Sequence, residues 1–255
     1  MGHVAIIEGL SRYPIKGFSP EALRTVQLWA GQGVAGDRLF ALENGPSGFD
    51  PKAPSHISKM RFAVLAPMAE VARFSLTRAA GETEFQVTGP HAPPLRVDLA
   101  TEAGARAFAT YVQHGLGDLC QGPLRLVQAP PHRFFDHPRG EVSLINLATL
   151  SDLGQRIGRE IDPVRLRGNL WLSGWPPGYE LDLTPGTKIA LGEVAAEIIG
   201  PIRRCVATHV NPTTAERDLD LVGALQSEFG HANCGVYVKI LQDGALRIGD
   251  AVKVG

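Results

Sequence analysis

The fold is decided by residues 203–235, RRCVATHVNPTTAERDLDLVGALQSEFGHANCG. In this stretch two arginines precede a cysteine, and the sequence signals of a turn and then of a helix follow it. The run Cys205–Val210 is short and rich in apolar and β-branched residues, which predicts a strand. Asn211-Pro212 is a turn signal, and the apolar spacing of Leu219–Phe229, closed by a glycine, predicts a helix. The rest of the chain is interpreted outward from this strand, turn and helix.

Short strand-like runs recur on both sides of this stretch, and segments with glycine or proline separate them. The chain holds 29 glycines and 19 prolines, so it has many points at which a strand can end. The runs comprise residues 3–12, 25–29, 39–43, 73–78, 83–88, 95–99, 124–129, 142–145, 169–172, 188–191, 194–199, 236–241 and 251–254. This spacing predicts a mixed α/β protein dominated by β-strands, of the barrel or sandwich type.

Apolar periodicity predicts two more helices. Residues 101–114 repeat apolar side chains at i, i+3 and i+4 behind Thr101, a suitable N-cap. Apolar side chains within residues 150–157 recur at i, i+3 and i+7 behind Asn146, which we expect to cap that helix. Residues 130–140, with two histidines and three prolines, are predicted to be irregular.

The composition excludes several classes of protein. With 44% hydrophobic and 20% charged residues, the chain is too apolar for a disordered segment. Its 25 lysines and arginines balance 26 acidic residues, so no overall positive field favours nucleic acid as a partner. The sequence has neither a basic leader before an apolar run nor a membrane-length apolar stretch. We therefore expect a cytoplasmic protein without a membrane partner.

Any cysteine chemistry depends on a single thiol, because the three cysteines form no C-x-x-C pair and are too few for a disulfide framework. Cys205 follows Arg203 and Arg204, and adjacent cations favour the thiolate, the form that binds metals and attacks electrophiles. A buried and inert cysteine is the competing interpretation of Cys205. It is the preferred interpretation of Cys120 and Cys234.

Taken whole, the second half of the chain resembles the MOSC domain. Bacterial members of that family carry RC-x-x-T-x-V-N-P-x-T-G-x-R-D, then FGH, then GVY, and G-x-(I/L)-x-x-GD near the end. This chain matches those elements in order within residues 204–218, 229–231, 235–237 and 244–250. The segments that extend the likeness to nearly the whole chain are YPIKG (13–17), GVAGDRLFAL (33–42), VSLINLATL (142–150) and RLRGNLWLSG (165–174).

The resemblance implies two β-rich domains that form one cofactor cleft, as in the amidoxime-reducing component and its bacterial relatives. An N-terminal β-barrel-like domain is expected over residues 1–115, and a C-terminal MOSC β-barrel domain with a few helices over residues 116–255. In that subgroup the cysteine at the position of Cys205 is a thiolate ligand of molybdenum, beside the dithiolene sulfurs of a pyranopterin. Cys205 is therefore the expected metal ligand and catalytic residue.

The same resemblance implies which residues hold the molybdenum cofactor. Guanidinium groups bind phosphate bidentately and lysine supplies a point charge, so the residue types suit an anionic ligand. The cofactor-binding candidates are Lys16 of YPxK, Arg38 of GDR, Arg167 and Asn169 of RxRxN, and Arg204 and Thr208 of the cysteine motif. His231 of FGH is a second catalytic candidate, expected at the mouth of the site, with a histidine that only bonds to backbone as the alternative.

The implied activity is reduction of N-hydroxylated or N-oxide small molecules, with electrons from a separate protein of the ferredoxin or cytochrome type. One alternative is a sulfur or molybdenum-cofactor carrier that uses Cys205 without turnover. A weaker alternative is a pyridoxal-phosphate enzyme with Lys16 as the Schiff base.

Two positions depart from the family pattern. Gly17 stands where the amidoxime-reducing proteins have serine, which removes a possible hydroxyl contact to the cofactor. Ala215 replaces a common glycine, which predicts mild strain if the backbone there has a positive φ. Arg217 and Asp218 are interpreted as structural, and Asp218 is expected to cap the helix of residues 219–229.

Overall fold

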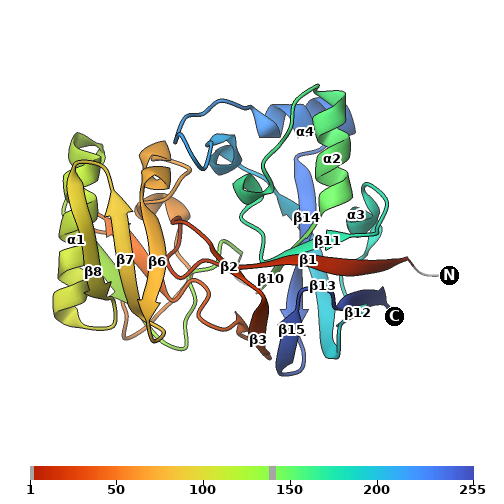
Figure 1. The fold of residues 1–255 in the computed structure, drawn as a ribbon, viewed down its shortest axis with the longest axis horizontal. Helices are drawn as coiled ribbons and strands as arrows, with labels where there is room; N and C mark the ends of the chain where they lie inside the picture. The colour runs from red at the N-terminus through yellow and green to blue at the C-terminus, as the bar shows by residue number, and fades with distance from the viewer. Residues whose placement is uncertain (1–2, 138–141) are drawn as a thin grey trace.

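A closed seven-stranded barrel forms one end of the molecule in the computed structural model, which describes residues 3–137 and 142–255 (Figure 1). Its strands, in order around the barrel, are β1 (Val4–Arg12), β11 (Leu170–Ser173), β10 (Val142–Asn146), β14 (Asn233–Ile240), β13 (Val194–Arg203), β12 (Lys188–Leu191) and β16 (Ala251–Val254). The pair β10–β11 is parallel and the other pairs are antiparallel. Because β1 pairs with both β11 and β16, the first strand of the chain closes the barrel.

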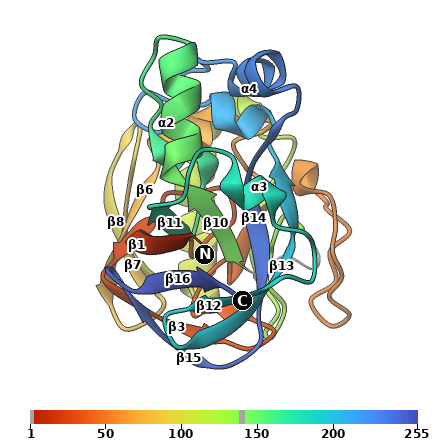
Figure 2. The same cartoon turned by 90° about the vertical axis from the view of Figure 1, so that its right-hand side faces the viewer.

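Alternation of side chains along the strands builds the barrel core. In β13, Val194, Ala196 and Ile198 are buried and point inward, as the two-residue period of a strand requires. β10 is buried on both faces. Leu144 joins the barrel interior, whereas Ile145 packs on the outside with α2 (Leu147–Arg156) and α4 (Leu221–Phe229). These two helices cover that side of the barrel (Figure 2).

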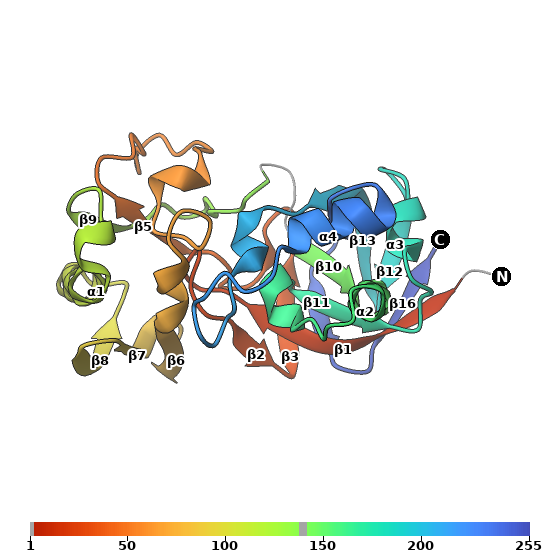
Figure 3. The same cartoon turned by 90° about the horizontal axis from the view of Figure 1, so that it is seen from above.

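The second lobe is smaller and consists of two sheets and a helix, well separated from the helix-covered side of the barrel (Figure 3). Its sheets are β5 (Phe40–Asn44) with β9 (Leu124–Gln128), and β6 (Ser75–Ala80) with β7 (Glu84–Gly89) and β8 (Ala92–Asp98). Helix α1 (Glu102–Leu116) packs its apolar face into a core of its own with these strands. Thr101 caps α1, because its side-chain oxygen accepts the Gly104 N–H at 3.0 Å.

Short elements complete the barrel side of the molecule. β2 (Glu21–Leu23) pairs with β1, and a fourth sheet joins β3 (Thr25–Trp29) to β4 (Gly33–Val34) and β15 (Gly244–Arg247) and packs against the barrel core. The remaining helix is α3 (Tyr179–Asp182). The 3₁₀ helices are η1 (Lys59–Arg61), η2 (Ala69–Arg73), η3 (Gly117–Leu119), η4 (Pro163–Leu166) and η5 (Val206–His209).

The fold confirms the predicted β-dominated class with a barrel and few helices. The predicted division of the chain at residue 115 stays a prediction, although β1 pairs with strands of the second half. Segment 130–140 is irregular through residue 137, and residues 138–141 lie outside the described part. In the described part of the chain, no helix has both the length and the hydrophobicity needed to cross a bilayer.

Two local predictions were wrong. The predicted strand Cys205–Val210 is instead a turn and the 3₁₀ helix η5, because the N–H and the hydroxyl of Thr208 both donate to the carbonyl of Cys205, at 3.0 and 2.8 Å. The predicted cap Asp218 lies ahead of the helix. α4 begins at Leu221, and Asp220 caps it by accepting the Gly223 N–H at 2.8 Å.

Candidate functional site

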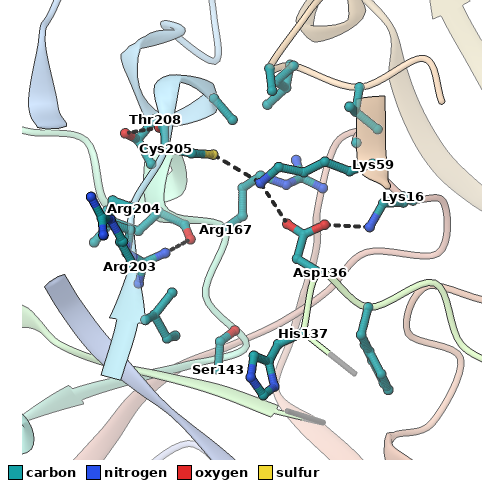
Figure 4. Close-up of a pocket in the computed structure, with 18 of the residues that line it drawn as sticks. Lys16, Lys59, Asp136, His137, Ser143, Arg167, Arg203, Arg204, Cys205 and Thr208 are labelled. Atoms are coloured by element: carbon teal, nitrogen blue, oxygen red, sulfur yellow. Dashed lines mark hydrogen bonds and ion pairs between the residues drawn. The ribbon is translucent and has the colours of Figure 1, made fainter. Parts of the chain in front are cut away.

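A cavity of about 280 Å³ lies between the two lobes. Figure 4 shows its wall, to which segments from distant parts of the sequence contribute. Seven of the described lining residues carry a cationic side chain, and one carries a carboxylate. The cations are Lys16, Arg38, Lys59, Arg165, Arg167, Arg203 and Arg204, and the acid is Asp136. A chain with balanced overall charge thus concentrates positive charge at one cavity.

Cys205 lines the cavity at the point where the chain leaves β13. It is the residue that precedes η5, in extended conformation, and its side chain is partly exposed. The two hydrogen bonds from Thr208 hold the Cys205 carbonyl and so fix the backbone that carries the thiol. Thr208 therefore acts on Cys205 through the backbone, and its hydroxyl hydrogen is already donated within the turn.

Lys59 is a charged neighbour of this thiol: its Nζ donates to Cys205 Sγ at 3.2 Å (Figure 4). Burial alone would lower the pKa of Lys59, but Asp136 and Cys205 outweigh burial and hold that pKa above its ordinary value. Lys59 was not among the site residues predicted from the sequence. It lies at the start of η1, after a segment rich in proline and polar residues, and no motif marks it.

Asp136 lies between Lys59 and Lys16 in the cavity wall (Figure 4). Its carboxylate accepts a short hydrogen bond from Lys16 and lies 3.9 Å from Lys59 Nζ. Lys16 is buried and donates a second hydrogen bond, at 2.9 Å, to the carbonyl of Phe134. Burial lowers the pKa of Lys16, and Asp136 offsets this only in part. Lys16 and Lys59 hold the pKa of Asp136 below its ordinary value.

Arg38 and Arg167 both contact one aromatic ring, that of Tyr13. Their guanidinium carbons are 4.8 and 4.3 Å from the centre of the Tyr13 ring, which is fully buried. Both arginines have a left-handed backbone, with φ of 48° and 53°, a conformation that costs a non-glycine residue on the order of 1 kcal/mol. Burial raises the pKa of Tyr13 to about 12, so the phenol stays neutral.

The two guanidinium groups differ in how they are bonded. Arg38 donates to Asp37, to Asn169 Oδ1 at 3.4 Å and to the Arg167 carbonyl at 3.3 Å. Arg167 donates from Nη1 to the Phe18 carbonyl at 2.8 Å, whereas its buried Nη2 has no partner among the described residues. A buried donor without a partner costs about 1–3 kcal/mol. Arg167 also lines the cavity, so an unused donor belongs to one of the cavity's cationic side chains.

Asn169 and Arg204 line the cavity, but their polar atoms serve the protein itself. Asn169 Oδ1 accepts from the N–H and hydroxyl of Ser143 at 3.1 and 2.8 Å, and its Nδ2 donates to Ser11. Arg204 donates to the carbonyls of Cys234 and Leu166. The Asn169 contacts tie the start of β11 to β10 and β1, and the Arg204 contacts tie the end of β13 to β14 and η4. They indicate that Asn169 and Arg204 also have a positioning role, in addition to the predicted contact with a cofactor.

His231 is the one predicted site residue that is absent from the described cavity wall. It follows Gly230, which has a positive φ at the end of α4, and its Nδ1 accepts the Asn233 N–H at 3.2 Å. This is the backbone-bonded turn histidine that the sequence analysis kept as the alternative. The structure thus brings Cys205 and the six predicted cofactor contacts together and leaves His231 apart.

The two departures from the family pattern have different structural settings. Gly17 has φ +90°, and a Cβ at this position would lie 2.9 Å from Val64 Cα and 3.0 Å from the Ala63 carbonyl oxygen. In this chain the backbone of residues 63–64 thus occupies the space of a side chain there. Ala215 has φ 62°, which confirms the strain predicted for an alanine at that turn.

Asp218 and Arg217 are structural, as interpreted from the sequence. Asp218 pairs with Arg165 at 2.7 Å and Arg159 at 2.9 Å, and accepts from Asn211. Arg217 donates to the carbonyls of residues 65 and 66, and so links the turn after η5 to the smaller lobe.

Comparison with known proteins finds a match to a domain family in the second half of the chain. Residues 131–253 match the model of the MOSC domain, whereas no curated protein matches the chain. Among solved structures, the chain resembles the YUAD protein from Bacillus subtilis at 14% identity, with 98% of this chain and 95% of that chain covered and a TM-score of 0.45.

Two further structures are YiiM from Geobacillus stearothermophilus, at 19% identity and TM-score 0.37, and YiiM from Escherichia coli, at 14% and 0.36. The first match covers 46% of this chain and 54% of YiiM, and the second covers 47% and 56%. Residues 131–253 thus match the MOSC domain, a domain family associated with binding of the molybdenum cofactor.

Proposed function

We propose that this protein binds a molybdenum cofactor in the cavity between its lobes and reduces N-hydroxylated or N-oxide small molecules. One observation carries the proposal: Cys205 and Arg167, whose buried Nη2 has no partner among the described residues, line the same cationic cavity. A soft thiolate suits a metal that is already held by sulfur. A guanidinium N–H suits a phosphate or a pterin acceptor.

The residues present fit such a group. No cluster of three metal-binding side chains occurs in the described part of the chain, and Cys205 is the one thiol on the described cavity wall. Cys205 would supply one metal ligand, and the dithiolene sulfurs of the cofactor would supply others. Lys16 and Arg167 would hold its anionic part. Arg38 and Tyr13 would keep the Arg167 guanidinium in place through the contacts described above.

The bound cofactor would supply two-electron redox chemistry with oxygen-atom transfer. The protein's own contribution is electrostatic and geometric. Lys59 donates a hydrogen bond to Cys205 Sγ and so stabilises negative charge on the sulfur. Thr208 holds the backbone of Cys205, which carries the thiol. The remaining walls are formed by backbone and by apolar side chains such as Val64 and Ile202.

We also infer that a separate electron-transfer protein is the reductant and that the protein acts in the cytoplasm. Neither a bound donor nor a second redox centre is needed for the test, because a reduced viologen dye can supply electrons chemically.

The test is turnover by protein purified from a host that makes the cofactor. An amidoxime is incubated with reduced methyl viologen, and the amidine product is measured by chromatography. Wild type is expected to form amidine in proportion to its molybdenum content, whereas Cys205→Ala is not. Molybdenum-loaded wild type that forms no product, but releases sulfane sulfur from Cys205, would replace this proposal with the sulfur-carrier function.

A further inference from the structure

Asp136 occupies an unusual place in the cavity. It is the one carboxylate among the described lining residues, and it faces two ammonium groups that come from different segments (Figure 4). The Lys16 side chain is 6% exposed, whereas that of Asp136 is 50% exposed. The carboxylate is thus open to solvent and ligand, while the lysine that it pairs with is enclosed.

The neighbouring contacts do not depend on Asp136. Phe134 is buried and packs against Phe49 and Phe62, with ring centres 5.0 and 5.7 Å apart. Its N–H donates to the Arg38 carbonyl at 3.0 Å, and its own carbonyl accepts from Lys16. The backbone at residue 134 is therefore anchored, and Lys16 keeps one acceptor when Asp136 moves away.

The ion pair that Asp136 makes with Lys16 is weak enough for an anionic ligand to displace the carboxylate. An ion pair with a half-exposed partner contributes about 1 kcal/mol or less, because water screens the attraction and the side chain loses freedom. A phosphate group carries more negative charge than a carboxylate and offers more acceptor oxygens to two ammonium groups. A phosphate-bearing ligand that reaches Lys16 and Lys59 would therefore outcompete Asp136 for them.

We infer that the Asp136 carboxylate occupies, in the ligand-free chain, the subsite that receives an anionic phosphate group of the ligand. Binding then requires Asp136 to release Lys16 and Lys59, so the carboxylate is an internal competitor that tunes affinity and returns when the ligand leaves. The inference rests on the proposed function for the identity of the physiological ligand. The competition itself concerns any phosphate and can be measured without molybdenum.

The experiment titrates inorganic pyrophosphate into cofactor-free protein by calorimetry at one fixed ionic strength. Asp136→Asn and Asp136→Ser, two neutral variants of a half-exposed residue, are both expected to bind pyrophosphate about tenfold more tightly than wild type. Asp118→Asn, a change of the same charge at an exposed position outside the cavity, is expected to match wild type. Lys16→Met is expected to abolish the gain in the Asp136→Asn background.

Unchanged or weaker binding by both Asp136 variants would overturn the inference, because Asp136 would then be a support that holds the lysines for the ligand. Absence of binding in wild type and in both variants would also overturn it. Molybdenum per chain, measured on separate cofactor-loaded preparations, distinguishes this failure from failure of the proposed function. If the Asp136 variants bind pyrophosphate more tightly but the protein never acquires molybdenum, the role of Asp136 as a competitor is supported and the proposed molybdenum-dependent activity is refuted.

Discussion

Lys59 Nζ lies 3.2 Å from Cys205 Sγ, although 146 positions separate the two residues in the chain. The contact joins the smaller lobe to the barrel at the thiol that the proposed chemistry uses. An ammonium group at this distance stabilises negative charge on sulfur, whether the sulfur binds a metal or attacks an electrophile. The reactivity of Cys205 is therefore expected to depend on a residue outside the MOSC motif.

The first prediction concerns this dependence. Lys59→Met is expected to slow alkylation of Cys205 by iodoacetamide at neutral pH by about threefold to tenfold in cofactor-free protein, because the attacking sulfur loses its neighbouring cation. Peptide mass spectrometry follows Cys205 separately from the other two cysteines. Lys52→Met changes an exposed lysine of the same loop and serves as the control. Equal rates for all three proteins would contradict the electrostatic role of Lys59.

A second prediction concerns the Tyr13 ring, which Arg38 and Arg167 both contact. Tyr13→Phe keeps the ring and removes a buried hydroxyl for which the described residues provide no partner, so stability is expected to stay equal or to rise by up to about 1 kcal/mol. Tyr13→Leu removes the aromatic face, and cofactor content is expected to fall severalfold because Arg38 and Arg167 lose their common support. Pterin fluorescence and thermal unfolding measure the two effects. Similar pterin content in both variants would show that the aromatic face is dispensable.

A third prediction concerns Gly17. Gly17→Ser, which introduces the residue found in the amidoxime-reducing proteins, is expected to lower the free energy of unfolding by about 2 kcal/mol or more. The cause is twofold: a positive φ and a Cβ that would lie 2.9 Å from Val64 Cα.

Gly48→Ser is the matched control for this change. Gly48 has φ +81° with open space around a Cβ, so only the backbone cost of about 1 kcal/mol applies. Urea unfolding of both variants separates the two contributions. If Gly17→Ser proves no more costly than Gly48→Ser, then the close approach of residues 63–64 has no energetic effect.

A fourth prediction concerns pH. Arg165 and Asn211 outweigh burial and hold the pKa of Asp218 below its ordinary value. A carboxyl with a depressed folded-state pKa stabilises the fold above its unfolded-state pKa of about 3.9, and this stability is lost as pH falls through the folded-state value. Asp218→Asn is expected to cost about 2 kcal/mol at pH 7, because Arg165 is buried and loses its ionic partner.

The measurement is urea unfolding of wild type and Asp218→Asn at pH 7 and at pH 3. The difference in unfolding free energy between the two proteins is expected to shrink at the lower pH. A difference that stays constant would show that Asp218 contributes through hydrogen bonds alone.

The strands and helix caps were predictable because their signals are local. Thr101 caps α1 and Asn146 caps α2 as predicted, since a side-chain oxygen two or three residues before an apolar run needs only its own helix. The position of β1 in the barrel depends instead on pairing with β11 and β16, more than 150 residues away. No pattern within residues 4–12 reveals those partners.

The site was predictable to the extent that motifs marked it. Lys16, Arg38 and Arg167 stand in recognisable segments, and the structure brings them to the cavity of Cys205. Lys59 and Asp136 lie in segments rich in proline, where neither periodicity nor spacing distinguishes a buried charge from a solvated one. The strand predicted at Cys205 failed because the Thr208 hydrogen bonds outweigh the β-propensity of Val206 and Val210.

The most direct test of the account is the amount of molybdenum and pterin per chain in wild type and in Cys205→Ala, both purified from a host that makes the cofactor. The account predicts about one molybdenum per wild-type chain, as expected for a single thiolate site, and a large loss of molybdenum in Cys205→Ala. Folded wild-type protein that carries neither molybdenum nor pterin would contradict it.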